Sequence, residues 1–492
     1  MSAPARSSST GLDRRTWRIA IVVILGSIMS VLDTTVVNVA LEPLSRDLNV
    51  TLDDIQWVAT GYLLSLAAII PVTGWAGKRF GARPVFIAAL VLFTLGSALC
   101  GLANSAGSLT AFRVLQGVGG GMLTPIGQII LVRATPREKL PRVMSAIGVP
   151  IVLAPIFGPT LGGLLIEHVS WQSIFWINVP IGLLTFVAAW RLLPRDEPEG
   201  AERLDVLGLI LVAAGVVGVT YGLAESGDTG TLASGQVLIP LAIGLVLIAA
   251  FVLRALRIEF PLLDVRLYAN RAFSAASITT FCLGGALFGA MILMPLYFQI
   301  VRGEDAVTTG LLLIPQGIGA AIAMHVSGRS TERFGGGLTA FLGGAITLVA
   351  TVPFLLLNGE TSYWLIGAAM VFRGFGIGMS IMPAMTAAYT VLRGDQVNDA
   401  TPQLTTLMRV GGSIGTAILT VILQSQLTHA GPQASADAMA DGFNVAFVWV
   451  MGITVVALLP TLLLMAAERR ARNERLDPQA QATAEELTME AA

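Results

Sequence analysis

Apolar residues dominate this chain in long, nearly unbroken runs separated by short polar segments. The runs recur from Trp17 to Ala467, and each holds roughly 20 residues, the length an α-helix needs to cross a hydrocarbon core of about 30 Å. Glycine and proline inside a run are compatible with such helices, because membrane helices tolerate both. The pattern predicts fourteen membrane-spanning helices, at residues 17–40, 55–76, 84–103, 108–132, 143–166, 172–192, 206–224, 236–256, 272–301, 306–328, 337–358, 361–391, 404–427 and 444–467.

Composition supports this fold class, an all-α polytopic membrane protein. Hydrophobic residues make up 54% of the chain and charged residues 12%, whereas about a quarter of the residues of a soluble domain are charged. The formal net charge of −1 provides no electrostatic basis for binding nucleic acid. The two cysteines lie inside apolar runs and cannot build a disulfide framework, and we expect no metal site, no cofactor and no cleavable signal peptide.

The distribution of basic residues predicts the orientation. Lysine and arginine are concentrated on the cytoplasmic side of membrane proteins. Of the 30 in this chain, 25 fall in the tails, or in loops and helix ends on one side of the predicted membrane. The loops on the other side hold only Arg46 and Arg302. We therefore expect a multi-pass protein of the cytoplasmic membrane with both termini in the cytoplasm.

The sequence contains an internal repeat. The segment from Val72 to Gly81 matches the pattern V-[ST]-G-x4-R-F-G, and so does the segment from Val326 to Gly335, 254 residues later. Two six-helix halves related in this way are a known plan of transporters, in which the substrate site lies near the bilayer midplane between the halves. The repeat predicts an N-terminal tail (1–16), a first six-helix bundle (17–192), a linker with two additional helices (193–271), a second six-helix bundle (272–467) and a C-terminal tail (468–492).

One acidic residue, Asp33, lies inside the first apolar run. The chain has 31 acids, and the others fall in loops, in tails or near a helix end. An acid within the membrane is costly and is by default a functional candidate. Asp33 shares a helical face with Ser30 and Val37, and we expect this face to line a cavity, because a charge turned to lipid would be penalised. There Asp33 would take up and release protons. The alternative is an acid kept ionised in a salt bridge that fixes the first helix.

Three arginines also lie within predicted spans: Arg113, Arg373 and Arg409. Arginine stays charged in proteins, so Arg113 can tune the proton affinity of a nearby acid without titrating itself. The alternative for Arg113 is a structural role, as a counter-ion for helix dipoles or through snorkelling. Arg373 occupies the equivalent place in the repeat, since it follows Phe372 as Arg113 follows Phe112. For Arg373 and Arg409 we expect packing and hydrogen bonds to helix carbonyls.

Several motifs occur in order along the chain: Leu32-Asp-Thr-Thr-Val-Val-Asn-Val-Ala-Leu41, Gln56-Trp57 with Tyr62, the loop from Gly74 to Arg83, Arg113-Val-Leu-Gln-Gly117, Gly158-Pro-Thr-Leu-Gly-Gly163, Phe175-Trp-Ile-Asn-Val-Pro-Ile-Gly182 and Pro295-Leu-Tyr-Phe-Gln-Ile-Val-Arg-Gly303. With these motifs the chain resembles the major facilitator superfamily, and within it the fourteen-span drug:proton antiporter family of Emr-type and Qac-type multidrug exporters. The resemblance covers nearly the whole chain. It implies the major facilitator fold and a role for Arg113 in proton transfer.

The resemblance also bears on two further segments. Small residues in the span 143–166 let helices approach closely, and in the resembled family this signature is associated with exporters: Pro155, Gly158, Pro159, Gly162 and Gly163. The loop after the second span and its repeat carry residues that either latch one closed state or anchor the topology: Gly74, Lys78, Arg79, Gly81, Arg83 and Arg333. The family has an aspartate where this chain has Lys78, which calls the usual charge relay of this loop into question.

Aromatic, methionine and glutamine side chains within the spans are the candidates for substrate contacts. Aromatics and adaptable methionines suit loose recognition of amphipathic molecules, although each such residue is more often a packing residue or an interfacial anchor. The candidates are Gln56, Trp57, Tyr62, Gln116, Met291, Met294, Tyr297, Phe298, Gln299, Met379 and Met382.

These features lead to one functional hypothesis: a proton-coupled antiporter, not an enzyme, that exports amphipathic or cationic drugs by alternating access. Its expected partners are small amphipathic molecules, protons and membrane lipids. Whether a periplasmic adaptor takes part is left open by the sequence. No ATP-binding loop of the G-x4-G-K-[ST] type occurs in the sequence, so the proton gradient is the expected energy source. The alternatives are a dedicated exporter of a lipid, a siderophore or an endogenous antibiotic, and a non-transporting membrane receptor or channel.

Overall fold

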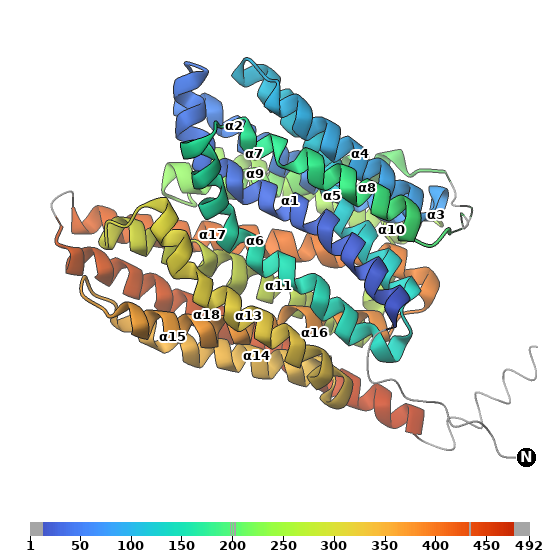
Figure 1. Ribbon diagram of the computed structural model, residues 1–492. Helices are drawn as coiled ribbons and strands as arrows, with labels where there is room; N and C mark the ends of the chain where they lie inside the picture. Colours follow the sequence, from blue (N-terminus) through green and yellow to red (C-terminus); the bar gives the residue numbers. More distant parts are fainter. Residues whose placement is uncertain (1–12, 197, 199, 201–202, 432–433, 477–492) are drawn as a thin grey trace, which may run out of the picture.

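The computed structural model describes residues 13–196, 198, 200, 203–431 and 434–476, without the side chains of residues 52–53, 149–152, 155–156, 228, 306 and 471–476. This part of the chain consists of helices and short connections (Figure 1). Within it, 13 helical segments are long and apolar enough to cross a membrane. The remaining predicted span, 143–166, corresponds to the 29-residue helix α6 (Leu140–His168). The all-α membrane fold is confirmed, and the helix positions are compatible with fourteen spans.

The first half of the chain supplies six predicted spans. Its helices are α1 (Arg14–Asp47), α2 (Leu52–Ile69), α3 (Thr73–Phe80), α4 (Ala82–Gly101), α5 (Ala106–Ala134), α6, α7 (Ser173–Trp176) and α8 (Asn178–Leu192), with short 3-10 turns at η1 (Ile70–Val72) and η2 (Arg137–Lys139). The 3-10 turn between α2 and α3 contains Pro71, which has no backbone N–H to continue the α-helical ladder. Polar caps fix helix starts: Asp13 accepts a hydrogen bond from the Thr16 N–H at 2.9 Å, and Ser105 accepts one from the Ser108 N–H at 3.2 Å.

Two additional helices follow, α9 (Val206–Thr229) and α10 (Gly235–Arg257). They approach closely because glycines line their contact: a Cβ on Gly218 would lie 2.9 Å from the Pro240 carbonyl oxygen. Asp205 caps α9 and accepts two hydrogen bonds from Arg254, at 3.0 and 2.9 Å, which closes the hairpin. Helix α9 packs against both α2 and α17 (Val397–Ala430), so it contacts both halves of the molecule.

The second half supplies the other six spans. Its helices are α11 (Arg271–Met291), α12 (Leu293–Leu296), α13 (Ala306–Phe334), α14 (Gly336–Thr351), α15 (Tyr363–Gly378), α16 (Ile381–Thr390), α17 and α18 (Ala436–Leu476). A π-helical turn, η4 (Tyr297–Val301), follows α12, and 3-10 turns lie at η3 (Val265–Ala269), η5 (Val352–Leu356) and η6 (Gly394–Gln396). Helix α18 reaches Leu476, so it extends into the segment 468–492 that the sequence predicts as a tail.

The internal repeat extends to backbone conformation and helix capping. Gly81 and Gly335, 254 residues apart, have φ values of +89° and +94°, which glycine adopts without steric cost. In the helix that follows each glycine, the first backbone N–H groups donate hydrogen bonds to a carboxylate from a distant part of the chain. Asp196 accepts hydrogen bonds from the N–H groups at the start of α4, one of them at 3.2 Å. Glu468 accepts two from the start of α14, at 3.0 and 2.8 Å. A negative charge at a helix N-terminus is favourable, so both halves fix this corner in the same way.

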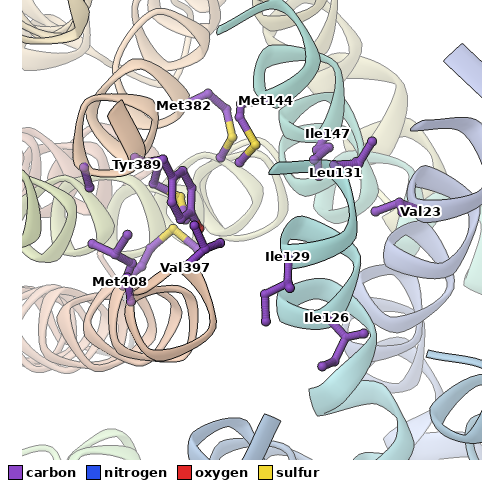
Figure 2. Close-up of a cluster of buried hydrophobic side chains, with 14 of the residues drawn as sticks. Val23, Ile126, Ile129, Leu131, Met144, Ile147, Met382, Tyr389, Val397 and Met408 are labelled. Carbon is purple, nitrogen blue, oxygen red and sulfur yellow. The ribbon is translucent and has the colours of Figure 1, made fainter. Parts of the chain in front are cut away.

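The two halves meet along a continuous hydrophobic cluster. Helices α6 and α13 pack side by side, and Figure 2 shows Met144 of α6 beside Met382 of α16, with Tyr389 and Met408 in the same cluster. A Cβ on Gly148 would lie 2.6 Å from the Met382 side chain, so the glycine admits this methionine. The interface between the halves is therefore apolar and closely packed where α6 faces α16.

Candidate functional site

Asp33 lies on α1 and is held by a side chain from α5. Arg113 Nη1 donates a hydrogen bond to Asp33 Oδ2 in a salt bridge, and the two side chains are 1% and 0% exposed, respectively. The sequence alone left open whether Arg113 reaches Asp33. The fold brings these two residues, 80 positions apart, into one buried ion pair.

Two amides complete the surroundings of the carboxylate. Gln116, one turn after Arg113, donates from Nε2 to Asp33 Oδ1 at 2.9 Å, and Asn178 at the start of α8 donates from Nδ2 to the same oxygen at 3.1 Å. Arg113 also donates to Gln116 Oε1 at 2.9 Å and, through Nε, to the Val58 carbonyl of α2 at 3.1 Å. Helices α1, α2, α5 and α8 thus supply the partners, so the cluster forms only when the first half is assembled.

Tyr62 of α2 covers the Arg113 guanidinium. Arg113 Cζ lies 4.0 Å from the centroid of the Tyr62 ring, which is a cation–π distance. The Tyr62 hydroxyl donates to the Ser30 carbonyl at 3.1 Å. A Cβ on Gly120 would lie 2.7 Å from that hydroxyl, so the glycine makes room for it. Tyr62 and Gln116, predicted as substrate contacts, therefore belong to the ion-pair cluster.

The chemistry of this cluster follows from its burial. A buried ion pair is stable when its other hydrogen-bonding positions are satisfied, whereas removing one partner costs about 3–5 kcal/mol because a charge is left unpaired. The ion pair between Asp33 and Arg113, with both oxygens of the carboxylate hydrogen-bonded, therefore ties α1 to α5.

The expectation that Asp33 lines a cavity is wrong for this conformation. Asp33 is 3% exposed, while at neighbouring positions of α1 Thr34 is half-buried and Asn38 is exposed. The reason is that Arg113 and the two amides occupy the space around the carboxylate and hydrogen-bond both of its oxygens. The alternative reading, an ionised acid in a salt bridge that fixes the first helix, describes this conformation.

Arg373, the repeat counterpart of Arg113, has different surroundings. It lies on α15, is 1% exposed, and donates from Nη1 to Gln316 Oε1 of α13 at 3.1 Å. Its Nε has no hydrogen-bond partner, and no acidic side chain of the described residues pairs with it. The expected hydrogen bonds to helix carbonyls are not found for Arg373 in the described part of the chain, because its bond goes to a side-chain amide.

Arg409 of α17 also has no acidic partner among the described residues. Its Nε is buried without a hydrogen bond, while the side chain as a whole is half-buried. Helix α17, which carries Arg409, packs against α3 and α5 of the first half of the molecule. The carbonyl bonds expected from the sequence are not found for Arg409 in the described region either.

Ion pairs join the two halves at the end of the molecule that carries the basic loops, which we call the basic end. Lys78 Nζ of α3 lies 2.5 Å from Asp399 Oδ2 of α17, and Arg142 Nη2 of α6 lies 2.6 Å from Glu332 Oε2 of α13. A Cβ on Gly74 would lie 2.2 Å from a carbonyl oxygen of α17. Lys78 stands where the resembled family has an aspartate, and here Asp399 supplies the opposite charge.

Two further hydrogen bonds reinforce the basic end. The Ser145 and Ser327 hydroxyls are 2.9 Å apart, and Arg137 Nη2 donates to the Leu392 carbonyl at 2.9 Å. For the residues that the structure describes, the hydrogen bonds and ion pairs between the first and second halves all lie at this end. The structure therefore represents a conformation closed at the basic end.

Two of the other predicted loop residues, Arg83 and Arg333, have local partners. Arg83 donates to the Trp190 carbonyl of α8, and its Cζ lies 5.6 Å from the Trp190 ring. Arg333 is exposed, with its Cζ 5.1 Å from the Phe334 ring, and Arg79 is exposed. The contacts of Arg83 and Arg333 do not bridge the halves, whereas those of Lys78 and Gly74 do.

The small residues of α6 act as the sequence predicts at two positions. A Cβ on Gly158 would lie 2.0 Å from Thr35 Oγ1 of α1, and one on Gly162 would lie 3.1 Å from Val36. Both glycines thus permit the close approach of α1 and α6. The remaining members of the signature are Gly163, whose Cβ would lie 3.6 Å from Val307, the half-buried Pro159, and Pro155, whose side chain lies outside those described.

The predicted substrate contacts do not form one site. Met294, Tyr297 and Phe298 are buried in the core of the second half, where the Tyr297 hydroxyl donates to the Asn358 carbonyl at 2.7 Å. Trp57 is 48% exposed and stacks on Tyr221 of α9, with ring centroids 6.1 Å apart. The others are Met382, buried in the cluster at the interface of the halves, Met379, buried, Gln56 and Met291, half-buried, and Gln299, exposed.

Sequence reasoning missed three residues that complete the contacts above: Asn178, Asp399 and Glu332. Asn178 lies inside a motif that carries the family resemblance, and an amide within an apolar run is a signal that could have found it. Asp399 and Glu332 lie near helix ends, where an acid is ordinary. Only the fold shows that each faces a cation of the other half.

A membrane protein built of two repeated six-helix halves, with a buried ion pair within one of them, has the architecture of a secondary transporter. The chain belongs to the major facilitator superfamily, whose family model matches residues 23–416. The resemblance stated from its motifs is thereby confirmed, and the chain is a transporter of this superfamily.

Relatives of the chain carry names of drug resistance and export. It is 40% identical over 440 residues to the multidrug resistance protein B homolog of Mycobacterium tuberculosis, covering 88% of this chain and 81% of that protein. It is 30% identical over 451 residues to the tetracenomycin C resistance and export protein of Streptomyces glaucescens, covering 89% and 81%. The solved structure of the human organic anion transporter MFSD10 matches with a TM-score of 0.63 and 16% identity, covering 91% of this chain and 99% of that chain, which shows the fold alone.

Proposed function

We propose that this protein is a proton-coupled antiporter that exports amphipathic small molecules across the cytoplasmic membrane by alternating access. The observation that carries the proposal is the buried ion pair between Asp33 and Arg113, because a carboxylate inside a membrane bundle is a site where one proton changes the net charge of the interior. The names of the relatives support export and resistance as the biological setting.

The proposed cycle uses the two states of the ion pair. With Asp33 ionised, the pair ties α1 to α5, as in the present conformation. Protonation from the outer side releases Arg113 from its counter-ion and loosens the first half. The halves then rearrange about the site between them, and the proton leaves to the cytoplasm. A proton that crosses the full field contributes about 2.3 kcal/mol per 100 mV, which is enough to bias conformations that differ by a few kcal/mol.

The contacts of the basic end fit one state of this cycle. Lys78–Asp399 and Arg142–Glu332 hold the halves together there, and an inward-open state requires that these pairs separate. Surface-accessible ion pairs contribute about 1 kcal/mol or less each, so they can break and reform during a cycle. With the basic loops in the cytoplasm, the present conformation is the one closed toward the cytoplasm.

The test is transport by purified protein in liposomes with an imposed pH gradient, acidic inside. A non-titrating amphipathic dye is followed together with pyranine, which reports the internal pH. The wild type should take up dye while protons leave, and Asp33→Asn should reduce this uptake to the level of protein-free liposomes. Glu42→Gln is the matched control, because Glu42 lies on the same helix in an exposed ion pair with Arg46.

The outcomes separate the alternatives. Proton-driven uptake that survives Asp33→Asn at the wild-type rate would rule out the role of this acid. Dye flux that is independent of the gradient would indicate a channel. Uptake of lipid but of no dye would indicate a dedicated exporter.

A further inference from the structure

The membrane-spanning helices carry more positive than negative charge in their interior. Arg113, Arg373 and Arg409 lie within α5, α15 and α17, while Asp33 is the acid that the sequence places within a predicted span. Because Asp33 is fully engaged by Arg113, Arg373 and Arg409 are left without a carboxylate partner in the described part of the chain. An intramembrane cation without a counter-ion is costly and needs a functional reason.

Of these two arginines, Arg409 is the one placed between the halves. Its helix, α17, packs against α3 and α5 of the first half, and the preceding residue, Met408, is part of the cluster at the interface (Figure 2). Arg373 instead lies inside the second half, bonded to Gln316, with 1% of its surface exposed. Arg409 is therefore the partly exposed cation on a helix that contacts the other half, whereas Arg373 is enclosed.

Arg409 also has an unused hydrogen-bond donor. Its Nε is buried and makes no hydrogen bond, and the half-buried side chain leaves part of its surface accessible. Snorkelling does not satisfy this group: Arg409 lies 12 residues after Val397, the first residue of α17, which is about 18 Å along the helix axis. A guanidinium presents several N–H donors in a fixed planar fork that matches carboxylate and phosphate oxygens.

We propose that Arg409 binds the acidic group of the transported molecule, so that the preferred substrates are amphipathic acids rather than cationic drugs. This inference rests on the proposed function for the transport step but not for the binding step. A bound carboxylate supplies the missing hydrogen-bond acceptor and the missing negative charge at the same time. A cationic amphipath meets the uncompensated positive charge of Arg409 and is disfavoured.

The binding test uses three pyrene probes of matched size: pyrenebutyrate, its methyl ester, and a pyrenebutyl trimethylammonium salt. Affinity is measured by fluorescence with the purified protein in phosphatidylcholine nanodiscs at pH 7.5, without a proton gradient. The wild type should bind the acid at least about tenfold more tightly than the ester or the cation, because hydrogen bonds to charged groups are the strong ones. Equal affinities, or tighter binding of the cation, would overturn the proposal.

Substitutions test whether Arg409 causes the preference for the acidic probe. Arg409→Gln should reduce affinity for the acid about tenfold and leave the ester unchanged, whereas Arg409→Lys should keep most of the preference because it keeps the charge. Arg393→Gln, at an exposed cation of the basic end, should change nothing. An equal loss for all three probes in Arg409→Gln would mean a structural role and would overturn the proposal. If that variant does not fold, the wild-type order of affinities and Arg409→Lys decide.

An anionic lipid headgroup presents negatively charged oxygens to Arg409, as the carboxylate of an acidic substrate does. Replacing phosphatidylcholine by phosphatidylglycerol in the nanodiscs should weaken acid binding less than twofold. Complete loss of acid binding would assign the position to an anionic lipid and overturn the proposal. Selective acid binding without proton-driven transport would leave this inference intact and refute the proposed antiport, so the two failures are distinguishable.

Discussion

The two halves of the molecule treat equivalent arginines in different ways. Arg113 in the first half meets a carboxylate, a side-chain amide, a backbone carbonyl and an aromatic ring. Arg373 in the second half donates one hydrogen bond to Gln316 and leaves its Nε unpaired. The repeat relates even these neighbours, because Gln316 lies 254 residues after Tyr62, the offset that relates Val72 to Val326. The repeat has thus kept the cation in both halves and the acid in one.

This difference in acidic partners bears on where the proposed proton coupling would reside. In the first half, a proton on Asp33 changes a closed network in which the carboxylate accepts hydrogen bonds from three side chains. In the second half, no acid of the described residues pairs with Arg373, and Arg373 itself stays charged. We therefore expect proton coupling to reside in the first half, with the second half contributing a fixed positive charge.

The largest expected effect on stability comes from replacing Arg113 by glutamine, and the same substitution at Arg373 in the other half is the comparison. Arg113→Gln leaves Asp33 buried and unpaired, and should lower the free energy of unfolding by about 3–5 kcal/mol. Arg373→Gln breaks no ion pair and should cost about 1 kcal/mol or less. Chemical denaturation in mixed micelles measures both. Equal losses would show that the two arginines are equally compensated, and the comparison would fail. Adding Asp33→Asn to Arg113→Gln should recover most of the loss.

The contact that joins the halves should give a smaller effect. Lys78→Asp removes an ion pair with Asp399 and adds a repulsion, which together should destabilise the closed basic end by about 1–2 kcal/mol. The readout is alkylation of a cysteine placed by Ser327→Cys in a variant without Cys100 and Cys282. The alkylation rate should rise about tenfold, because a free-energy change of this size shifts the equilibrium between the closed and open states by about that factor. The charge-swapped double variant, Lys78→Asp with Asp399→Lys, should return to the original rate, and failure to do so would remove Lys78 from the latch.

A third test gives the second half the acid it lacks. Gln316→Glu offers Arg373 a charged acceptor in place of an amide, and should raise the free energy of unfolding by about 1 kcal/mol, because charge-assisted hydrogen bonds are stronger than neutral ones. Gln316→Met is the control and should be destabilising, since it leaves the guanidinium without its bond. Destabilisation by Gln316→Glu at neutral pH would mean that the positive charge at Arg373 is already compensated.

Local pattern sufficed to predict much of the architecture. Apolar run length set the helix positions, and the V-[ST]-G-x4-R-F-G repeat set the relation of the halves. Asp33 and Arg113 stood out because a charge inside an apolar run needs a partner. Which partner it has depends on how four helices assemble, and no local pattern contains that. The aromatic and methionine candidates failed to converge on one site for a related reason: the same residue types fill cores, as Tyr297 and Phe298 do here.

The smallest expected effect concerns the ring that covers Arg113. Tyr62→Phe keeps the cation–π contact, 4.0 Å from Arg113 Cζ to the ring centroid, and removes one hydrogen bond to the Ser30 carbonyl. It should therefore cost about 0.5–1 kcal/mol of unfolding free energy. Tyr62→Gln gives the first half the residue that the second half has at Gln316, and should cost about 0.5–1 kcal/mol more through the lost cation–π contact. If Tyr62→Gln is no worse than Tyr62→Phe, the ring contributes nothing to holding the arginine. The contrast between the halves would then rest on Asp33 and on the hydrogen bonds of Arg113 to Gln116 and Val58.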